Sequence, residues 1–199
     1  MKRKIFIIFL FLILHILFFC CYKFFVPGNN KHIEDVSDLN DFISSIKEYN
    51  AESKIIVNSN KNSNIYTLLQ SNCGGVSRQE IRNVENNSGI IIENVDNCLT
   101  IKNTQLSVEK IFSNYAGVIK NSVGLDSFVE DYLNDENKEI IDKDGYYIIS
   151  VKNKNSQNKY SLSKTLFFNK KENSIEKIVV KDINNNETTV IEYIKLEIL

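Results

Sequence analysis

The spacing of apolar residues divides this 199-residue chain into segments of different structural type. Residues 5–19 are apolar almost without interruption, residues 35–50 place apolar side chains every three or four positions, and much of the remainder alternates apolar with polar side chains. A continuous run indicates a leader or a membrane segment, the wider spacing indicates an amphipathic helix, and alternation indicates β-strands. The sequence therefore predicts an apolar N-terminal segment followed by a domain that contains both helices and strands.

The first predicted helix spans residues 35–50. Asp35 or Ser37 can cap its start, because a short polar side chain at that point accepts a hydrogen bond from a free backbone N–H group. Its apolar stripe comprises Val36, Leu39, Phe42, Ile43 and Ile46.

A second helix is predicted over residues 125–133, where Ser127 with Glu130 resembles a capping box. Residues 106–115 also carry apolar side chains at helical spacing and predict a further short helix. The stripe of the second helix comprises Leu125, Phe128, Val129, Tyr132 and Leu133.

The other periodic segments predict an antiparallel sheet, because the short polar links between them favour pairing of consecutive strands. In the last strand, Val190, Ile194, Leu196 and Ile198 are expected to share one face. The expected fold is α+β: a curved, half-closed antiparallel sheet, or saddle, of about nine or more strands, with two or three helices on its concave face. The predicted strands are residues 54–58, 65–70, 78–84, 89–95, 98–102, 146–151, 159–168, 175–182 and 187–198.

Residues 1–21 have the pattern of an export signal: three basic residues, the apolar run and a pair of cysteines. Lipoprotein processing requires a small residue before the modified cysteine. Cys21 follows Cys20, whereas Cys20 follows the bulky Phe19, so Cys21 is the favoured lipidation site and Cys20 the alternative. An uncleaved anchor helix is the other interpretation of this segment. Either arrangement leaves the rest of the chain tethered on the outer face of a membrane.

Residues 22–34 are interpreted as a linker and residues 35–199 as a single domain. The chain contains two histidines, His15 in the apolar run and His32 in the linker. A domain without histidine excludes a Ser-His-Asp triad, a Cys-His pair and a histidine-based zinc site. No cofactor or metal is expected.

The net charge of the exported part is mildly negative. Three of the 24 basic residues precede the apolar run, so 21 remain against 25 acidic residues, a net charge of −4. No basic tract is present, and a nucleic-acid partner is therefore not expected.

Few side chains of the domain suggest chemistry. Cys73 is expected in the turn before the strand of residues 78–84, and Cys98 is expected to open a strand two positions further across the sheet. Two strand spacings are about 9–10 Å, beyond the reach of a disulfide unless the sheet curls strongly. Catalytic carboxylates at Asp126, Glu130 and Asp131 are the alternative to a simple role at a helix start and on a solvated face. The chain is predicted not to be an enzyme.

The order of these elements, with several short motifs, resembles bacterial lipoprotein carriers of the LolA and LolB type. Within that fold, the chain is similar to a clostridial subgroup, the spore germination-specific lipoproteins of the GerS family. Arg78 and Glu80, on one face of their strand, match the Arg-x-Glu strand of the carriers. The other matching segments are residues 89–94, 99–101, 114–115, 121–122, 125–132, 177–182 and 195–196.

The resemblance implies a role without catalysis. GerS-like proteins partner a sporulation N-acetylmuramoyl-L-alanine amidase, CwlD, and are needed for its part in making the muramic-δ-lactam of the spore cortex, which is recognised during germination. By this resemblance the chain binds and activates a CwlD-like amidase. The expected location is the outer forespore membrane or the intermembrane space.

Two other roles follow from the fold itself. A lipid or lipoprotein carrier requires an open apolar cavity under the sheet, which the two helix stripes either line or fill. A homodimer is expected if the long terminal strand, residues 187–198, pairs with a second copy through a free edge. The sequence does not identify the residues of a partner interface.

Overall fold

The computed structural model describes residues 32–59, 61–82, 89–96, 98–113, 123–152 and 160–199. The chain divides into two compact units, Met1–His32 and Ile33–Leu199, and the second contains all of the helices and strands described below. The predicted export segment, with Cys20 and Cys21, lies outside the described residues. In the part that is described, no helix combines the length and the apolar character needed to cross a membrane.

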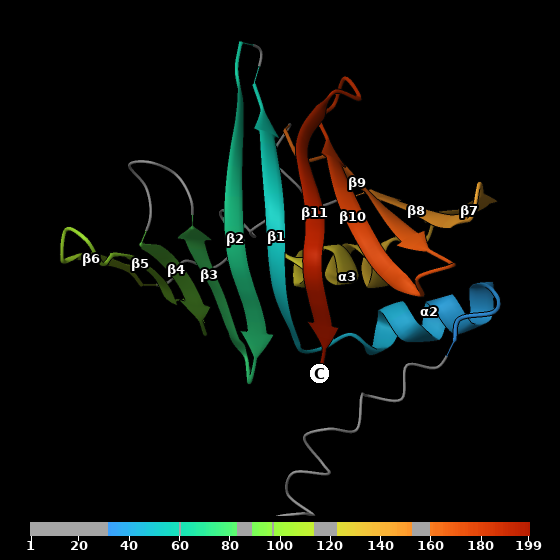
Figure 1. The fold of residues 1–199 in the computed structure, drawn as a ribbon, viewed down its shortest axis with the longest axis horizontal. Coiled ribbons are helices and arrows are strands. Elements are labelled where there is room, and N and C mark those ends of the chain that lie inside the picture. The colour runs from blue at the N-terminus through green and yellow to red at the C-terminus, as the bar shows by residue number, and fades with distance from the viewer. Residues whose placement is uncertain (1–31, 60, 83–88, 97, 114–122, 153–159) are drawn as a thin grey trace, which may run out of the picture. The chain divides into compact units, whose positions relative to one another are not determined.

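A single antiparallel sheet of eleven strands forms the second unit (Figure 1). Its order is β6-β5-β4-β3-β2-β1-β11-β10-β9-β8-β7, so two meanders meet where β1 pairs with β11. The prediction of an α+β domain built on an open antiparallel meander is therefore confirmed. The strands are β1 (Tyr49–Asn58), β2 (Ser63–Cys73), β3 (Val76–Arg82), β4 (Ile90–Val95), β5 (Cys98–Asn103), β6 (Val108–Phe112), β7 (Glu139–Lys143), β8 (Tyr146–Lys152), β9 (Ser163–Asn169), β10 (Ser174–Lys181) and β11 (Glu187–Ile198).

The terminal strand β11 lies in the middle of the sheet. It pairs with β1 on one side and β10 on the other, which corrects the expectation of a free edge on residues 187–198. The edges of the sheet are instead β6 and β7. A partner that adds to the sheet of the native domain must therefore approach one of these two short strands.

The two helices, α2 (Val36–Ser45) and α3 (Leu125–Asn134), pack on one face of the sheet, which we call the inner face. Leu39 and Ile43 of α2 and Phe128 of α3 are fully buried, as the apolar stripes predicted. Burial of each such side chain contributes about 1.5–3 kcal/mol. Alternate residues of β1 supply the opposing surface, which includes Ile55. The opposite side of the sheet is called the outer face.

Three elements differ from the sequence prediction. Residues 106–115 were expected to contain a short helix, but Val108–Phe112 is strand β6. The first helix ends at Ser45 instead of continuing to residue 50, because Tyr49 already belongs to β1 and begins its alternation of buried side chains. Strand β7 was not predicted at all.

The expected common face of the last strand is also wrong. The pairing of β11 with β1 skips one residue, since Ser53 faces Tyr193 and Glu52 faces Lys195. This irregularity leaves Ile194 without a register partner, and its side chain is exposed. A β-bulge of this kind shifts the alternation of side chains between the two faces by one residue. Val190 therefore lies on a different face from Leu196 and Ile198.

Candidate protein-binding surface

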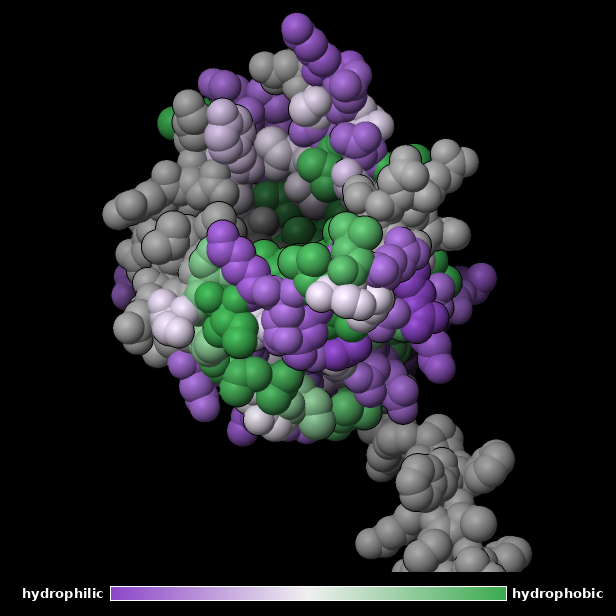
Figure 2. All heavy atoms as spheres, turned by 90° about the vertical axis from the view of Figure 1, so that its left-hand side faces the viewer, coloured by the Kyte–Doolittle hydropathy of each residue, from purple (hydrophilic) through white to green (hydrophobic). Residues whose placement is uncertain are grey.

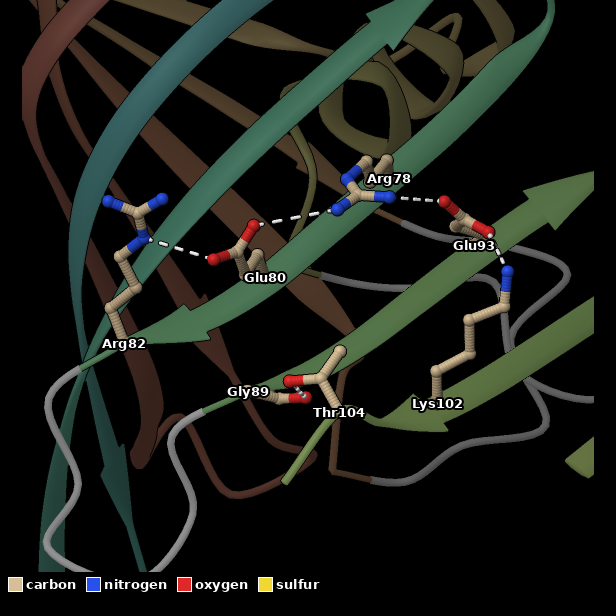
Figure 3. Close-up of polar contacts among 7 residues, drawn as sticks. All are labelled: Arg78, Glu80, Arg82, Gly89, Glu93, Lys102 and Thr104. Atoms are coloured by element: carbon tan, nitrogen blue, oxygen red, sulfur yellow. Dashed lines mark hydrogen bonds and ion pairs between the residues drawn. The ribbon is translucent and has the colours of Figure 1, made fainter. Parts of the chain in front are cut away.

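A row of ion pairs crosses the outer face of the sheet from β3 to the edge strand β6. Figure 3 shows its members on β3, β4 and β5. We call this row the ion-pair ladder. Its four strands are consecutive in the sheet, so the row connects the middle of one meander to its edge. Its members are, in order, Arg82, Glu80, Arg78, Glu93, Lys102 and Glu109.

The register of the strands produces the ladder. Arg78 and Glu80 are two residues apart on β3 and share the outer face, as the sequence predicted, with 3.5 Å between Nη2 and Oε2. Arg78 lies directly opposite Glu93 of β4 and contacts its carboxylate. Lys102 of β5 places its Nζ 3.2 Å from Glu93 Oε2 and 3.5 Å from Oε1 of Glu109, its register partner on β6.

The hydrogen bond from Lys102 lowers the pKa of Glu93, and the bond from Arg78 adds to this effect against a partial opposition from burial. The same contact with Glu93 raises the pKa of Lys102. Both groups are therefore charged at neutral pH. Since the side chains of the ladder are partly exposed, each pair contributes about 0–1 kcal/mol to stability. The ladder is thus better suited to fixing the positions of charges than to holding the fold together.

A groove on the outer face adjoins the ladder at Arg78 and Glu80. It has a volume of about 400 Å³, is open to solvent, and lies where β11, β1, β2 and β3 run side by side. Charged side chains of both signs surround it, which suits a polar partner group better than an apolar one. The lining residues are Asn50, Ala51, Glu52, Leu69, Gln70, Ser71, Arg78, Glu80, Lys195 and Glu197.

The far end of the ladder reaches a group of exposed apolar side chains on and beside β6. Leu106 is 71% exposed, Val108 58% and Ile111 59%, and Ile101 of β5 lies in the neighbouring strand. Figure 2 views the molecule from this side and shows hydrophobic side chains gathered around a hollow. The wing of the sheet formed by β3 to β6 therefore carries ordered charges on its outer face and apolar side chains at its edge, a combination typical of protein-binding surfaces.

Two of the three carboxylates considered as catalytic candidates, Asp126 and Asp131, anchor α3 instead. Asp126 Oδ1 accepts a hydrogen bond of 2.9 Å from the hydroxyl of Tyr49. That hydroxyl also accepts one of 3.1 Å from the backbone N–H of Leu125, the first residue of the helix. Burial, with the nearby charge of Asp126, raises the pKa of Tyr49, so this hydroxyl remains a hydrogen-bond donor.

Lys164 forms a second anchor, from β9. Its Nζ lies 2.7 Å from Oδ2 of Asp131 and donates to Ser127 Oγ at 2.6 Å and to the Ser127 carbonyl at 3.1 Å. Burial lowers the pKa of Lys164, and Asp131 opposes this effect. The predicted capping box is therefore wrong, because the cap position is Gly124 and the Ser127 hydroxyl lies inside the helix, where it accepts from Lys164. Glu130 is half-buried on the same helix.

The cysteines Cys73 and Cys98 are both free thiols. They lie on β2 and β5, three strand spacings apart, or about 14 Å. This agrees with the expectation that they do not pair, with a larger separation than predicted. Across the described ranges, no three His, Cys, Asp or Glu side chains are grouped so that they could share a metal ion.

No known protein family and no curated protein sequence matches this chain. Solved structures do match. A chain of the complex between the CwlD amidase of Clostridioides difficile and the GerS lipoprotein superposes with a TM-score of 0.52 and 20% identity, over 84% of this chain and 98% of that one. A LolA superfamily protein from Nitrosomonas europaea superposes with a TM-score of 0.43 and 12% identity, over 84% of this chain and 94% of that one.

The first of these similarities establishes the fold. The shared arrangement is the open antiparallel sheet with two helices on one face. The chain thus shares its fold with a GerS-like chain in the amidase complex, at an identity that shows the architecture only.

Proposed function

We propose that this chain is an exported, membrane-tethered lipoprotein without catalytic activity, which binds and allosterically activates a CwlD-like N-acetylmuramoyl-L-alanine amidase. The observation that supports it most directly is the fold shared with a chain of the CwlD–GerS complex over 98% of that chain. In this proposal the activated amidase takes part in muramic-δ-lactam formation in the spore cortex, and the chain acts at the outer forespore membrane. Lipidation at Cys21, or at Cys20, supplies the tether.

Activation of this kind needs no chemistry from the chain. A protein that binds the active conformation of an enzyme more tightly than its inactive conformation increases the active fraction, and a tenfold difference in affinity corresponds to about 1.4 kcal/mol. Apart from His32, the described residues include no histidine. The catalytic groups and any metal would belong to the amidase.

The test is a reconstitution with purified components. The full chain in mild detergent is added to a CwlD-like amidase, and release of stem peptides from spore-type peptidoglycan is followed with time. We expect the chain alone to release none and the amidase rate to rise with the chain in a saturable manner. Unchanged amidase activity at saturating chain, or release by the chain alone, would contradict the proposal.

A carrier of lipid or lipoprotein is the second candidate. It requires the sheet to be half-closed around an apolar cavity. Under β8 to β11 that space is filled by side chains such as Leu39, Ile43 and Phe128. The hollow seen from the β6 side is the observation in favour of a carrier (Figure 2). Extraction of fluorescent lipid from vesicles by the full chain would support this role, and its failure alongside amidase activation would exclude it.

A further inference from the structure

The two edges of the sheet differ in how they are protected from other strands. In β7, Glu139, Asp142 and Lys143 are charged and exposed, and Asp142 is held by Lys170 at 2.8 Å. Charged side chains on an edge strand are a common protection against pairing with another chain. Although Ile141 is 49% exposed, three of the five residues of β7 are charged, so this edge is protected against strand addition.

The β6 edge also carries two charged residues, Glu109 and Lys110, but it exposes more apolar surface than the β7 edge. Three of its five residues are apolar, and Val108 and Ile111 are each more than half exposed, as is Leu106 in the preceding turn. Among the described residues β6 pairs with β5 alone and is a terminal strand of the sheet. A short terminal strand with exposed apolar side chains is the geometry to which an extended peptide adds.

The side chains of β6 indicate which residue types such a peptide should carry on each face. Val108 and Lys110 lie on the inner face, where Lys110 Nζ is 4.9 Å from the centre of the Phe112 ring. Glu109 and Ile111 lie on the outer face, where Glu109 is the last member of the ion-pair ladder. Its carboxylate is half exposed and shares its only described cation, Lys102, with Glu93. A basic side chain opposite Glu109 would complete the alternation of charges.

We propose that β6 is the docking edge for an extended segment of the protein partner, which adds as a twelfth strand. This inference rests on the proposed role as a protein-binding subunit and identifies the surface used. The partner segment carries apolar side chains on the face next to Val108 and a lysine or arginine on the face next to Glu109. The ion-pair ladder holds Glu109 in place, and the pairing of Glu109 with the basic side chain determines the register of the added strand.

A second copy of the chain fits this edge less well. Two β6 strands related by a two-fold axis pair about a single residue, because antiparallel partners lie on the same face. Pairing about Lys110 or about Glu109 places identical charges opposite each other, which is unfavourable. Pairing about Ile111 leaves only residues 110–112 of each strand matched.

The experiment compares matched substitutions on the two edges. Ile111→Asp and, independently, Leu106→Asp change exposed side chains at β6, and Ile141→Asp changes a 49% exposed side chain at β7. Circular dichroism and thermal unfolding verify that each full-length variant, purified in mild detergent, is folded. Affinity for the purified CwlD-like amidase is then measured by calorimetry. We expect both β6 variants to bind about tenfold or more weakly, and the β7 variant to bind like wild type.

Hydrogen exchange gives a second readout, because strand addition protects backbone amides whereas side-chain docking alone does not. Bound amidase should slow exchange in the peptide that contains residues 108–112 and leave residues 139–143 unchanged. If all variants bind the amidase as tightly as wild type and β6 gains no protection from exchange, β6 is not the docking edge. The proposed function would still stand in that case. A wild-type chain that does not bind the amidase would overturn both. A dimer in light scattering that Ile111→Asp converts to a monomer would assign the edge to self-pairing instead.

Discussion

At the scale of single residues, Gly89 occupies a position where the backbone conformation requires glycine. It immediately precedes β4 with a φ of +84°, a left-handed conformation in which residues with a side chain are strained. Its carbonyl accepts hydrogen bonds from the backbone N–H of Thr104 at 2.9 Å and from the Thr104 hydroxyl at 3.1 Å (Figure 3). An added Cβ would lie 2.5 Å from that hydroxyl oxygen. Gly89 therefore sets the contact between the start of β4 and the end of β5.

Gly89→Ala is expected to lower the free energy of unfolding by about 1–3 kcal/mol, because it adds backbone strain to a steric conflict with Thr104. Urea unfolding of the full chain in mild detergent measures the change. Gly75→Ala is the matched control, since Gly75 has a similar φ of +78° but no atom within 4 Å of an added Cβ. Equal losses in the two variants would show that the contact with Thr104 is unimportant.

The ladder predicts a dependence of stability on pH. The pKa of Glu93 is lowered in the folded chain, so the stabilisation it provides is present above its ordinary value of 4.5 and is lost as the pH falls through the folded value. Below about pH 5, the free energy of unfolding of wild type should fall as Glu93 is protonated. The free energy of unfolding of Glu93→Gln should fall less over the same range, because glutamine does not titrate. Denaturant unfolding at a series of pH values measures both curves. Parallel curves would contradict the assigned role of Glu93.

At the scale of elements, much of the meander was readable from its alternation, and the failures have specific causes. Strand β7 was missed although Asp144 and Gly145 precede the apolar strand β8, a dipeptide typical of two-residue hairpin turns. Strand β6 was assigned as a helix because Val108, Ile111 and Phe112 have helical spacing, and its five residues do not alternate strictly between apolar and polar. Local spacing alone does not decide between the two structures when pairing with a neighbouring strand determines the outcome.

The anchoring of α3 could not be predicted from its own sequence. The N-cap residue of the helix is Gly124, which has no side chain to cap it, and the hydroxyl of Tyr49 on β1 accepts the hydrogen bond from Leu125 instead. Lys164 reaches the same helix from β9. These contacts join residues 37 and 76 positions apart, so they depend on the complete fold and leave no signature within the helix itself.

Lys164→Met is expected to destabilise the domain by about 3–5 kcal/mol, because it leaves Asp131 with no partner in a site where the lysine side chain is 1% and the aspartate side chain 13% exposed. Lys54→Met removes an ion pair whose side chains are 41% and 43% exposed, and should cost less than about 1 kcal/mol. Both values come from urea unfolding of the full chain in mild detergent. Similar losses in the two variants would mean that the buried pair does not hold α3 to the sheet.

At the scale of the whole molecule, two meanders are held together by the first and last strands. The sequence predicted the antiparallel order within each meander, because short links favour neighbouring pairs. It did not predict the pairing of Tyr49–Asn58 with Glu187–Ile198, which joins residues more than a hundred positions apart. The same long-range pair determines which strands become edges, and this is why the candidate docking edge at β6 was beyond the reach of sequence analysis.

Removal of residues 187–199 is expected to abolish folding of the whole sheet and not merely to shorten it, since the strand lost is shared by both meanders. Circular dichroism and near-ultraviolet spectra of the truncated chain measure the remaining order. A truncated chain that retains a cooperative unfolding transition would show that one meander is stable alone, contrary to this expectation.

The pairing of β1 with β11 also has a consequence for biosynthesis. Tyr49 lies opposite Ile198, and the backbone N–H of Leu199 donates to the carbonyl of Glu48 at 3.0 Å. Strand β11 is the last of the eleven described strands to be synthesised, so β1 has no partner on this side while the rest of both meanders is already present. The native sheet of a nascent polypeptide can therefore be completed only after β11 becomes available.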